Sequence, residues 1–236
     1  MRRALPLLAA AAVALGCSNI TDSGSGSGVV ALEVKVPSRL ELEVGDTIQL
    51  SARALDRNGD SVAADITWLS PDTTVGVVAT TGQVTGRFGG PLIGRVQAAE
   101  GTLVSDFLTF TVLAHADSLA LPTGAAVTVP AGTTASPPLD VKLLGAPDAE
   151  MGGHRIIFTL TSPVFADPAT RTMQFPNGAL TDTVTTGADG APVAPVTLNS
   201  VTGLTPPATA TVEVTAFRPS GAPVPGSGQT FTVTFQ

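Results

Sequence analysis

Apolar residues recur at every second position over most of the chain beyond residue 28, and this alternation predicts β-strands. A clear example is the run in which Leu139, Val141 and Leu143 alternate with Asp140 and Lys142. No segment outside the N-terminal leader has a helical period of comparable length. The other expected inward positions are Val30, Leu32, Val34, Val36, Leu40, Leu42, Val44, Ile48, Leu50, Ala52, Ala54, Ile66, Trp68, Leu108, Phe110, Val112, Ile156, Phe158, Leu160, Ala210, Val212, Val214, Ala216, Phe231, Val233 and Phe235.

Turn signals separate these runs at short, regular intervals. Residues 56–60 contain Asn58-Gly59, a pair that supplies positive φ at little cost, and Thr81-Gly82 marks another turn. The chain also has 25 glycines and 19 prolines. Short strands with one apolar face need a second sheet to cover that face, so the sequence predicts an all-β chain of β-sandwiches.

The N-terminus has the pattern of an exported leader. Arg2 and Arg3 precede an apolar run over residues 4–15, which is followed by Gly16 and Cys17. The run is shorter than the roughly 20 apolar residues that a helix needs to span a bilayer. Residues 14–17, Ala-Leu-Gly-Cys, resemble the lipobox of bacterial lipoproteins. This resemblance implies that residues 1–16 are a signal peptide and that Cys17 is lipidated. Residues 17–28, rich in glycine and serine, then form a flexible tether.

Residues 29–113 resemble the bacterial immunoglobulin-like group 2 family. The resemblance rests on four motifs in order, Val44-Gly45-Asp46-Thr47-Ile48-Gln49-Leu50, residues 56–59, Ile66-Thr67-Trp68-Leu69-Ser70-Pro71-Asp72 and Gly82-Gln83-Val84-Thr85-Gly86. The chain departs from the family pattern over residues 87–94. The resemblance implies an immunoglobulin-like β-sandwich.

Residues 117–236 resemble invasin-like (group 1) bacterial immunoglobulin-like domains. The resemblance rests on Thr185-Thr186-Gly187-Ala188-Asp189-Gly190 followed by Val196, Leu198 and the 208–217 strand. Residues 163–178 are an insertion. Residues 114–117 form a short junction, which predicts a semi-rigid pair of domains. The expected fold class is therefore all-β, with two tandem immunoglobulin-like β-sandwiches after a lipoprotein signal peptide.

Charge and cysteine content narrow the set of partners. The formal net charge is −7, and removal of Arg2 and Arg3 with the leader changes it to −9. Such a chain repels phosphates, so we expect no nucleic-acid partner. Membrane association is expected through the lipid on Cys17, because no basic patch is present. With a single cysteine the chain forms no intramolecular disulfide.

The sequence offers no convincing catalytic or metal site, and we expect neither an enzyme nor a cofactor. His115 and His154 are the only histidines, and no nucleophile or oxyanion motif accompanies His154. One lipidated cysteine and two separated histidines do not form a zinc site. Asp56, Asn58 and Asp60 have the oxygen spacing that calcium favours, but a hairpin turn explains them better. A calcium site that uses Asp117 at the junction is a weaker alternative.

Glu33, Glu41, Glu43 and Glu213 are predicted on solvated outward faces, unlike the facing carboxylates of a glycosidase. Trp68 shares the inward parity of Ile66, so we expect a core residue and not an exposed sugar platform. The best recognition surfaces are the loops 149–153, 163–178 and 218–228.

The sequence thus predicts a non-catalytic, lipid-anchored cell-envelope protein that serves as an adhesion, scaffold or spacer module. Its expected partner is a surface protein or a glycan. Ser18 after the cysteine favours the outer membrane or cell surface over the inner membrane, by analogy with the lipoprotein family. A carbohydrate-binding module is the main alternative, an enzyme built around His154 the second, and a purely structural stalk the third.

Overall fold

The computed structural model describes residues 28–165 and 167–236, and within them the regular structure is almost entirely β. A single turn of 3-10 helix, η1 (Pro168–Thr170), is the exception among these residues. The described residues include no helix with the length and apolar character that a membrane crossing requires. The leader and Cys17 lie outside the described residues.

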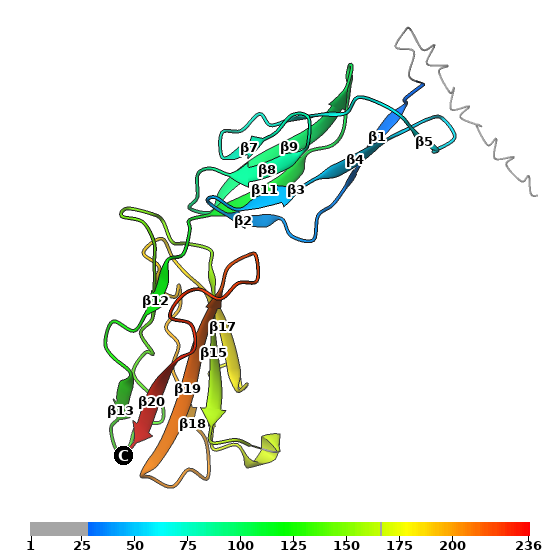
Figure 1. Ribbon diagram of the computed structural model, residues 1–236. Helices are drawn as coiled ribbons and strands as arrows, with labels where there is room; N and C mark the ends of the chain where they lie inside the picture. The colour runs from blue at the N-terminus through cyan, green and yellow to red at the C-terminus, as the bar shows by residue number, and fades with distance from the viewer. Residues whose placement is uncertain (1–27, 166) are drawn as a thin grey trace, which may run out of the picture.

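The first eleven strands form one β-sandwich (Figure 1). In one layer β1 pairs with β4, β4 with β5, and β3 with β8 and β7. In the other layer the order is β2-β11-β9-β6. The strands are β1 (Ala31–Lys35), β2 (Glu41–Glu43), β3 (Thr47–Gln49), β4 (Ser51–Leu55), β5 (Ser61–Val62), β6 (Thr67–Leu69), β7 (Val75–Val77), β8 (Gln83–Gly86), β9 (Leu92–Glu100), β10 (Leu103–Val104) and β11 (Leu108–Leu113).

The core of this sandwich confirms most of the alternation. Trp68 is 5% exposed and packs with Leu42, Val84 and Phe110 between the layers, as its parity predicted. Gly82 lies against the indole at φ +73°, where an added Cβ would come within 2.5 Å of Trp68 Nε1.

The parity prediction was wrong at both ends of β1. Val30 is 53% exposed and Val36 is 62% exposed, and Leu40 before β2 is also exposed, at 37%.

The remaining strands form a second β-sandwich. One layer has the order β13-β20-β19-β15-β17, and the other contains the pairs β12-β14 and β16-β18. The two pairs are linked by the chain before β14, where Ser136 N donates to Leu198 O and Leu139 N donates to Val196 O. The strands are β12 (Ser118–Ala120), β13 (Ala126–Val129), β14 (Lys142–Leu144), β15 (Arg155–Ser162), β16 (Met173–Gln174), β17 (Thr181–Thr185), β18 (Asn199–Ser200), β19 (Ala208–Phe217) and β20 (Gln229–Phe235).

The core of the second sandwich follows the predicted period of two closely. Every second residue of β15, β19 and β20 is buried, including Ile156, Phe158 and Val212. Phe158 meets Phe175 edge to face with ring centroids 6.5 Å apart. An edge-to-face arrangement places the positive edge of one ring against the negative face of the other.

The two sandwiches share one topological feature. In each, the second strand pairs in parallel with the last strand, β2 with β11 and β13 with β20, while all other pairings are antiparallel. The first strand of each unit pairs in the opposite layer, with β4 or β14. The chain therefore crosses between layers at the start of each unit, and the fold is two tandem immunoglobulin-like β-sandwiches.

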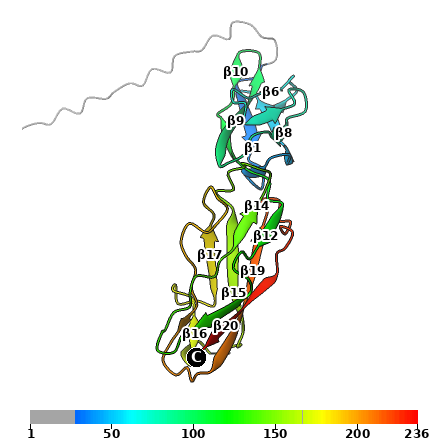
Figure 2. The same cartoon turned by 90° about the vertical axis from the view of Figure 1, so that its left-hand side faces the viewer.

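The two sandwiches lie end to end in both views (Figures 1 and 2). They are joined by residues 114–117, in which Ala114 and Ala116 are buried at 4% and 0% exposure. Asp117 N donates to Leu144 O, which fixes the linker to the second sandwich. The linker is thus part of a packed junction.

Candidate functional site at the domain junction

The centre of the junction is the carboxylate of Glu43, which has no exposed surface. Alternation along 40–44 assigned Glu43 to a solvated face together with Glu41, and for Glu43 this was wrong. Glu43 is the last residue of β2 and stands opposite Leu113, the last residue of β11. At that position the side chain leaves the end of the first sandwich, where the second sandwich covers it.

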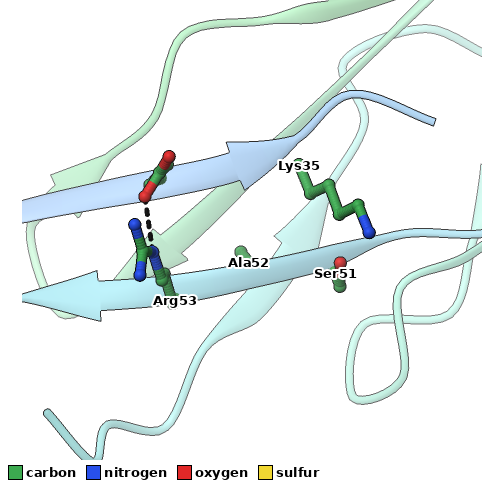
Figure 3. A pocket seen from close by; sticks show the side chains of 5 residues that line it. Lys35, Ser51, Ala52 and Arg53 are labelled. Carbon is green, nitrogen blue, oxygen red and sulfur yellow. Dashed lines mark hydrogen bonds and ion pairs between the residues drawn. The ribbon is translucent and has the colours of Figure 1, made fainter. Parts of the chain in front are cut away.

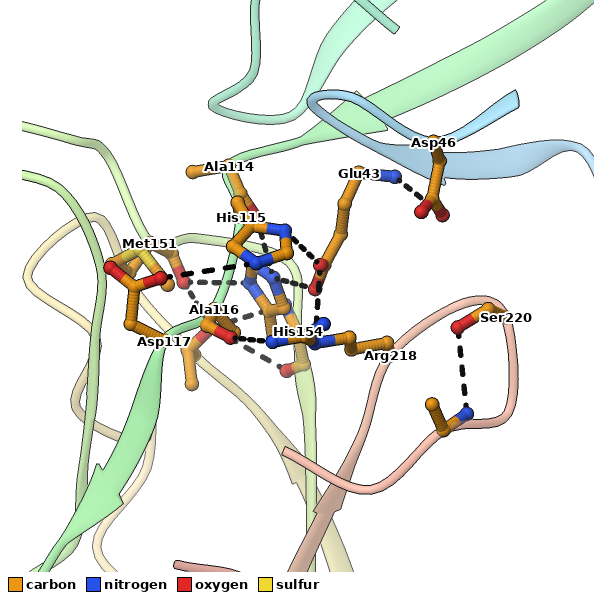
Figure 4. Close-up of polar contacts among 12 residues, drawn as sticks. Glu43, Asp46, Ala114, His115, Ala116, Asp117, Met151, His154, Arg218 and Ser220 are labelled. Atoms are coloured by element: carbon orange, nitrogen blue, oxygen red, sulfur yellow. Dashed lines mark hydrogen bonds and ion pairs between the residues drawn. The ribbon is translucent and has the colours of Figure 1, made fainter. Parts of the chain in front are cut away.

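Three basic side chains surround this carboxylate (Figure 4). His154 Nε2 lies 3.3 Å from Glu43 Oε1. His115 Nδ1 lies 3.0 Å and Arg218 Nε 3.5 Å from Glu43 Oε2. Neither contact to Oε2 has the alignment of a hydrogen bond. The basic groups come from the linker, from the segment before β15 and from the residue after β19, so the cluster joins three parts of the chain to β2.

His154 is fixed by backbone contacts on every side. Its Nδ1 lies 3.2 Å from Met151 O and its Nε2 lies 3.0 Å from Ala114 O. Its backbone N donates to Thr186 Oγ1 at 3.1 Å, and this hydroxyl in turn donates to Met151 O. Thr186 belongs to the 185–190 turn that carries the invasin-like resemblance. That turn therefore positions the histidine.

Three further contacts tie the cluster to its surroundings. Arg218 Nη2 donates to Ala116 O at 2.8 Å, which fixes the guanidinium against the linker. On the side of the first sandwich, Asp46 Oδ2 accepts from Glu43 N at 3.3 Å and pairs with Arg39 at 3.3 Å. A buried carboxylate is tolerated where opposite charges and hydrogen bonds compensate its lost hydration, and this cluster supplies both.

Glycine-rich loops from the two sandwiches meet beside the charged cluster. A Cβ built on Gly90 would lie 3.1 Å from Glu150 Cβ, and one on Gly153 would lie 3.0 Å from the Leu113 side chain. Gly153 and Gly152 also pack on Pro91. The segment 87–94, where the sequence departs from the group 2 pattern, therefore contributes to the domain contact.

Two of the three predicted recognition loops are used within the molecule. Loop 149–153 packs in the junction, with Met151 only 3% exposed. Loop 218–228 supplies Arg218 and folds back, so that Val224 is buried and Leu119 N donates to Pro225 O at 2.8 Å. Loop 163–178 buries Met173 and Phe175 but leaves Val164 87% exposed.

The turn at residues 56–60 is a hairpin turn, as predicted. Asp56 Oδ1 accepts from the backbone N of Asn58 at 2.8 Å and of Asp60 at 2.9 Å. These backbone hydrogen bonds hold the pKa of Asp56 below its ordinary value. Within the described residues, no group of three or more His, Cys, Asp or Glu side chains could hold a metal ion. Asp117 faces His115 Nε2 at 3.8 Å.

A shallow hollow of about 310 Å³ lies on the outer face of β1 and β4 (Figure 3). Glu33 pairs there with Arg53, and Lys35, Ser51 and Ala52 complete the lining. Both paired side chains are more than half exposed, at 52% and 59%. Glu33 thus lies on a solvated face as predicted, and this hollow has the character of ordinary charged surface.

The chemistry of the junction is that of a structural ion cluster. The ring nitrogens of His154 face a carboxylate and two backbone carbonyls, and the nearby hydroxyl of Thr186 is engaged with the backbone. A general base needs a ring nitrogen directed at a reacting group. This cluster was not predicted from the sequence. The two glycines that precede His154 are the feature from which a close approach of another segment could have been inferred.

Comparison with known proteins gives fold-level similarity only. No protein-family model matches the chain. A search of curated proteins likewise gave no match. Among solved structures, the adhesin InvE of Yersinia pseudotuberculosis is 17% identical with a TM-score of 0.44, over 90% of this chain and 62% of that one. The chain therefore spans less than two thirds of the InvE structure.

Two other structures give similar values. Fibronectin(III)-like modules of Clostridium thermocellum CbhA are 13% identical with a TM-score of 0.37, over 86% of this chain and 92% of that one. Domains 4 and 5 of the S-layer protein SbsC are 18% identical with a TM-score of 0.32, over 89% and 99% of the two chains. These identities and scores are low, so no residue role is carried over from these proteins.

Proposed function

We propose that this chain is a non-catalytic, lipid-anchored protein of the cell envelope, in which two immunoglobulin-like domains form a stiff adhesion, scaffold or spacer module. The observation that carries the proposal is the buried charge cluster around Glu43, which fixes one domain against the other. A stiff pair of domains holds its far end at a set distance and orientation from its anchor. A flexible pair would not.

The proposed anchor is the lipidated Cys17, followed by the tether over residues 17–28. β1 starts at the end of the first sandwich that is remote from β12 (Figure 1). An anchor at Cys17 would therefore place the first sandwich near the membrane and the second sandwich further out. From the motifs given above, we assign the first unit to the group 2 type and the second unit to the invasin-like type. From Ser18, we assign the protein to the outer membrane or cell surface.

The proposed recognition surface is the outer end of the second sandwich and its loop 163–178, which are not used in the junction. Strand addition at the edge strand β17 is less suited to this role. Thr181 O already accepts from Asn177 Nδ2 at 3.0 Å, and Thr185 O accepts from Val193 N at 2.9 Å. Carbonyls that are paired in this way are not free to bind an added strand.

The anchor is tested by metabolic labelling with a palmitate analogue in cells that express the wild-type chain or Cys17→Ser. The wild type should carry the label and fractionate with membranes, and Cys17→Ser should do neither. Labelling of both forms, or of neither, would refute the anchor.

Capture of partners from the same cells by cross-linking then tests the proposed role as an adhesion, scaffold or spacer module. A shared surface protein or glycan captured by the wild-type chain would support it, whereas hydrolysis of a captured ligand would refute the non-catalytic role.

A further inference from the structure

The surroundings of the His154 ring consist of hydrogen-bond acceptors only. Nδ1 lies 3.2 Å from Met151 O, and Nε2 lies 3.0 Å from Ala114 O and 3.3 Å from Glu43 Oε1. A neutral imidazole has one N–H and one lone pair. Either neutral tautomer would therefore direct a lone pair at a carbonyl oxygen, at a residue that is 2% exposed. With a proton on each nitrogen, every one of these contacts becomes a hydrogen bond.

We propose that His154 is a buried imidazolium that locks the two domains together, and that loss of its proton loosens the junction. The protonated ring donates through Nδ1 to Met151 O in the second sandwich. Through Nε2 it donates to Ala114 O in the linker and to the Glu43 carboxylate of the first sandwich. Its positive charge is matched by the carboxylate, which is also fully buried. The two N–H groups of the protonated ring thus connect three parts of the molecule.

Other charged groups would still connect the two domains after His154 lost its proton. His115 and Arg218 contact Glu43 Oε2, Asp117 lies near His115, Asp46 holds the backbone N of Glu43, and Glu150 packs on Gly90. Arg218 stays charged at every accessible pH, so Glu43 keeps one counter-charge. The expected response is a loosened junction and not dissociation of the two sandwiches.

His154 and His115 differ in how water can replace their contacts. The His115 side chain is 42% exposed, so water can take over its interactions if its charge changes. The His154 side chain is 1% exposed and its contacts are within the protein. Rising pH is therefore expected to act on the junction through His154.

The protonation state is tested by nitrogen-15 NMR on the full chain that carries Cys17→Ser. Two imidazoles are present, and His115→Gln assigns the remaining signals to His154. At neutral pH we expect both His154 nitrogens to be protonated, and we expect this state to persist to higher pH in the His115→Gln chain than in a Glu43→Gln chain. A neutral tautomer of His154 at neutral pH would overturn the proposal.

The pH response of the junction is tested by the distance between spin labels at Thr102→Cys and Thr202→Cys, which are exposed positions on the two sandwiches. The chain also carries Cys17→Ser. The distance distribution should be narrow at neutral pH and broaden as His154 loses its proton. A His154→Gln chain should give the broad distribution at all pH values, and Asp106→Asn, at an exposed position outside the cluster, should give the narrow one at neutral pH. If His154→Gln fails to fold, the distance distributions of the wild-type junction over the same pH range test the proposal.

This inference deepens the proposed spacer role and rests on it, and the outcomes separate the two. A broad distribution at every pH would overturn both, since the junction would then not be stiff. A narrow distribution that is unchanged while His154 deprotonates would overturn the switch and leave the stiff module standing.

Discussion

Glu43 Oε1 and His154 Nε2 lie 3.3 Å apart, although 111 positions separate the two residues in the chain. Glu43 ends β2 in the first sandwich, and His154 immediately precedes β15 in the second. Both side chains are buried, so the carboxylate relies on His154 and the neighbouring basic groups for contacts that water would otherwise supply. Removal of one partner of a buried pair leaves an uncompensated charge, which is much more destabilising than loss of an exposed pair.

Substitution of Glu43 by alanine is therefore expected to lower the free energy of unfolding by about 3–5 kcal/mol. Glu41→Ala is the matched control, because Glu41 lies on the same strand, is half exposed and pairs with Arg155 at 3.8 Å. The control should cost less than about 1 kcal/mol. Urea denaturation of both variants measures the difference. Equal losses for the two glutamates would contradict the structural role assigned to Glu43.

Two glycines at the junction give a steric test of how its segments pack. A Cβ on Gly89 would collide with the backbone at Leu113 and Ala114, whereas one on Gly152 would meet its nearest atom, in Pro91, at an ordinary 3.5 Å. Gly89→Ala is expected to destabilise the protein by about 1–3 kcal/mol through overpacking, while Gly152→Ala should be nearly neutral. Thermal unfolding of the two variants decides. A neutral Gly89→Ala would show that the loop at 87–91 does not pack on the linker.

The sequence predicted the two layers and most of the core but not the side-chain contacts between the two domains. Alternation is a local property, so Trp68, Phe158 and Val212 could be assigned to the interior without knowledge of their partners. Glu43 is buried because the other domain covers the end of its strand. The alternation of residues within a strand contains no information about such a contact. The same holds for loop 149–153, whose glycines indicated a loop but not the segment that packs on it.

Substitution of Trp68 separates the core assignment from a carbohydrate-binding role. Trp68→Ala is expected to lower the free energy of unfolding by about 3–5 kcal/mol, because it removes a large side chain from between the layers. Phe88→Ala should change stability little, since Phe88 is 58% exposed. Denaturation followed by glycan-array binding of both variants tests this. Loss of glycan binding by a Trp68→Ala protein of unchanged stability would favour the carbohydrate-binding alternative.

The ion pair between Asp72 and Arg95 predicts a specific acid dependence. Arg95 donates from Nε to Asp72 Oδ2 at 2.9 Å and from Nη2 to Oδ1 at 3.0 Å, and its backbone N donates to Oδ2 at 2.9 Å. The guanidinium hydrogen bonds hold the pKa of Asp72 below its ordinary value of 3.8. In turn the hydrogen bonds to the Asp72 carboxylate raise the pKa of Arg95 above its ordinary value.

Because the pKa of Asp72 is lower in the folded than in the unfolded chain, its contribution to stability is present above pH 3.8 and is lost as the pH falls through the folded value. Asp72→Asn should therefore be less stable than wild type by a constant amount above that pH, and the gap should close below it. Unfolding free energies measured from neutral pH to below 3.8 test this. A gap that stays constant into strong acid would show that Asp72 stabilises the loop by packing and not by its charge.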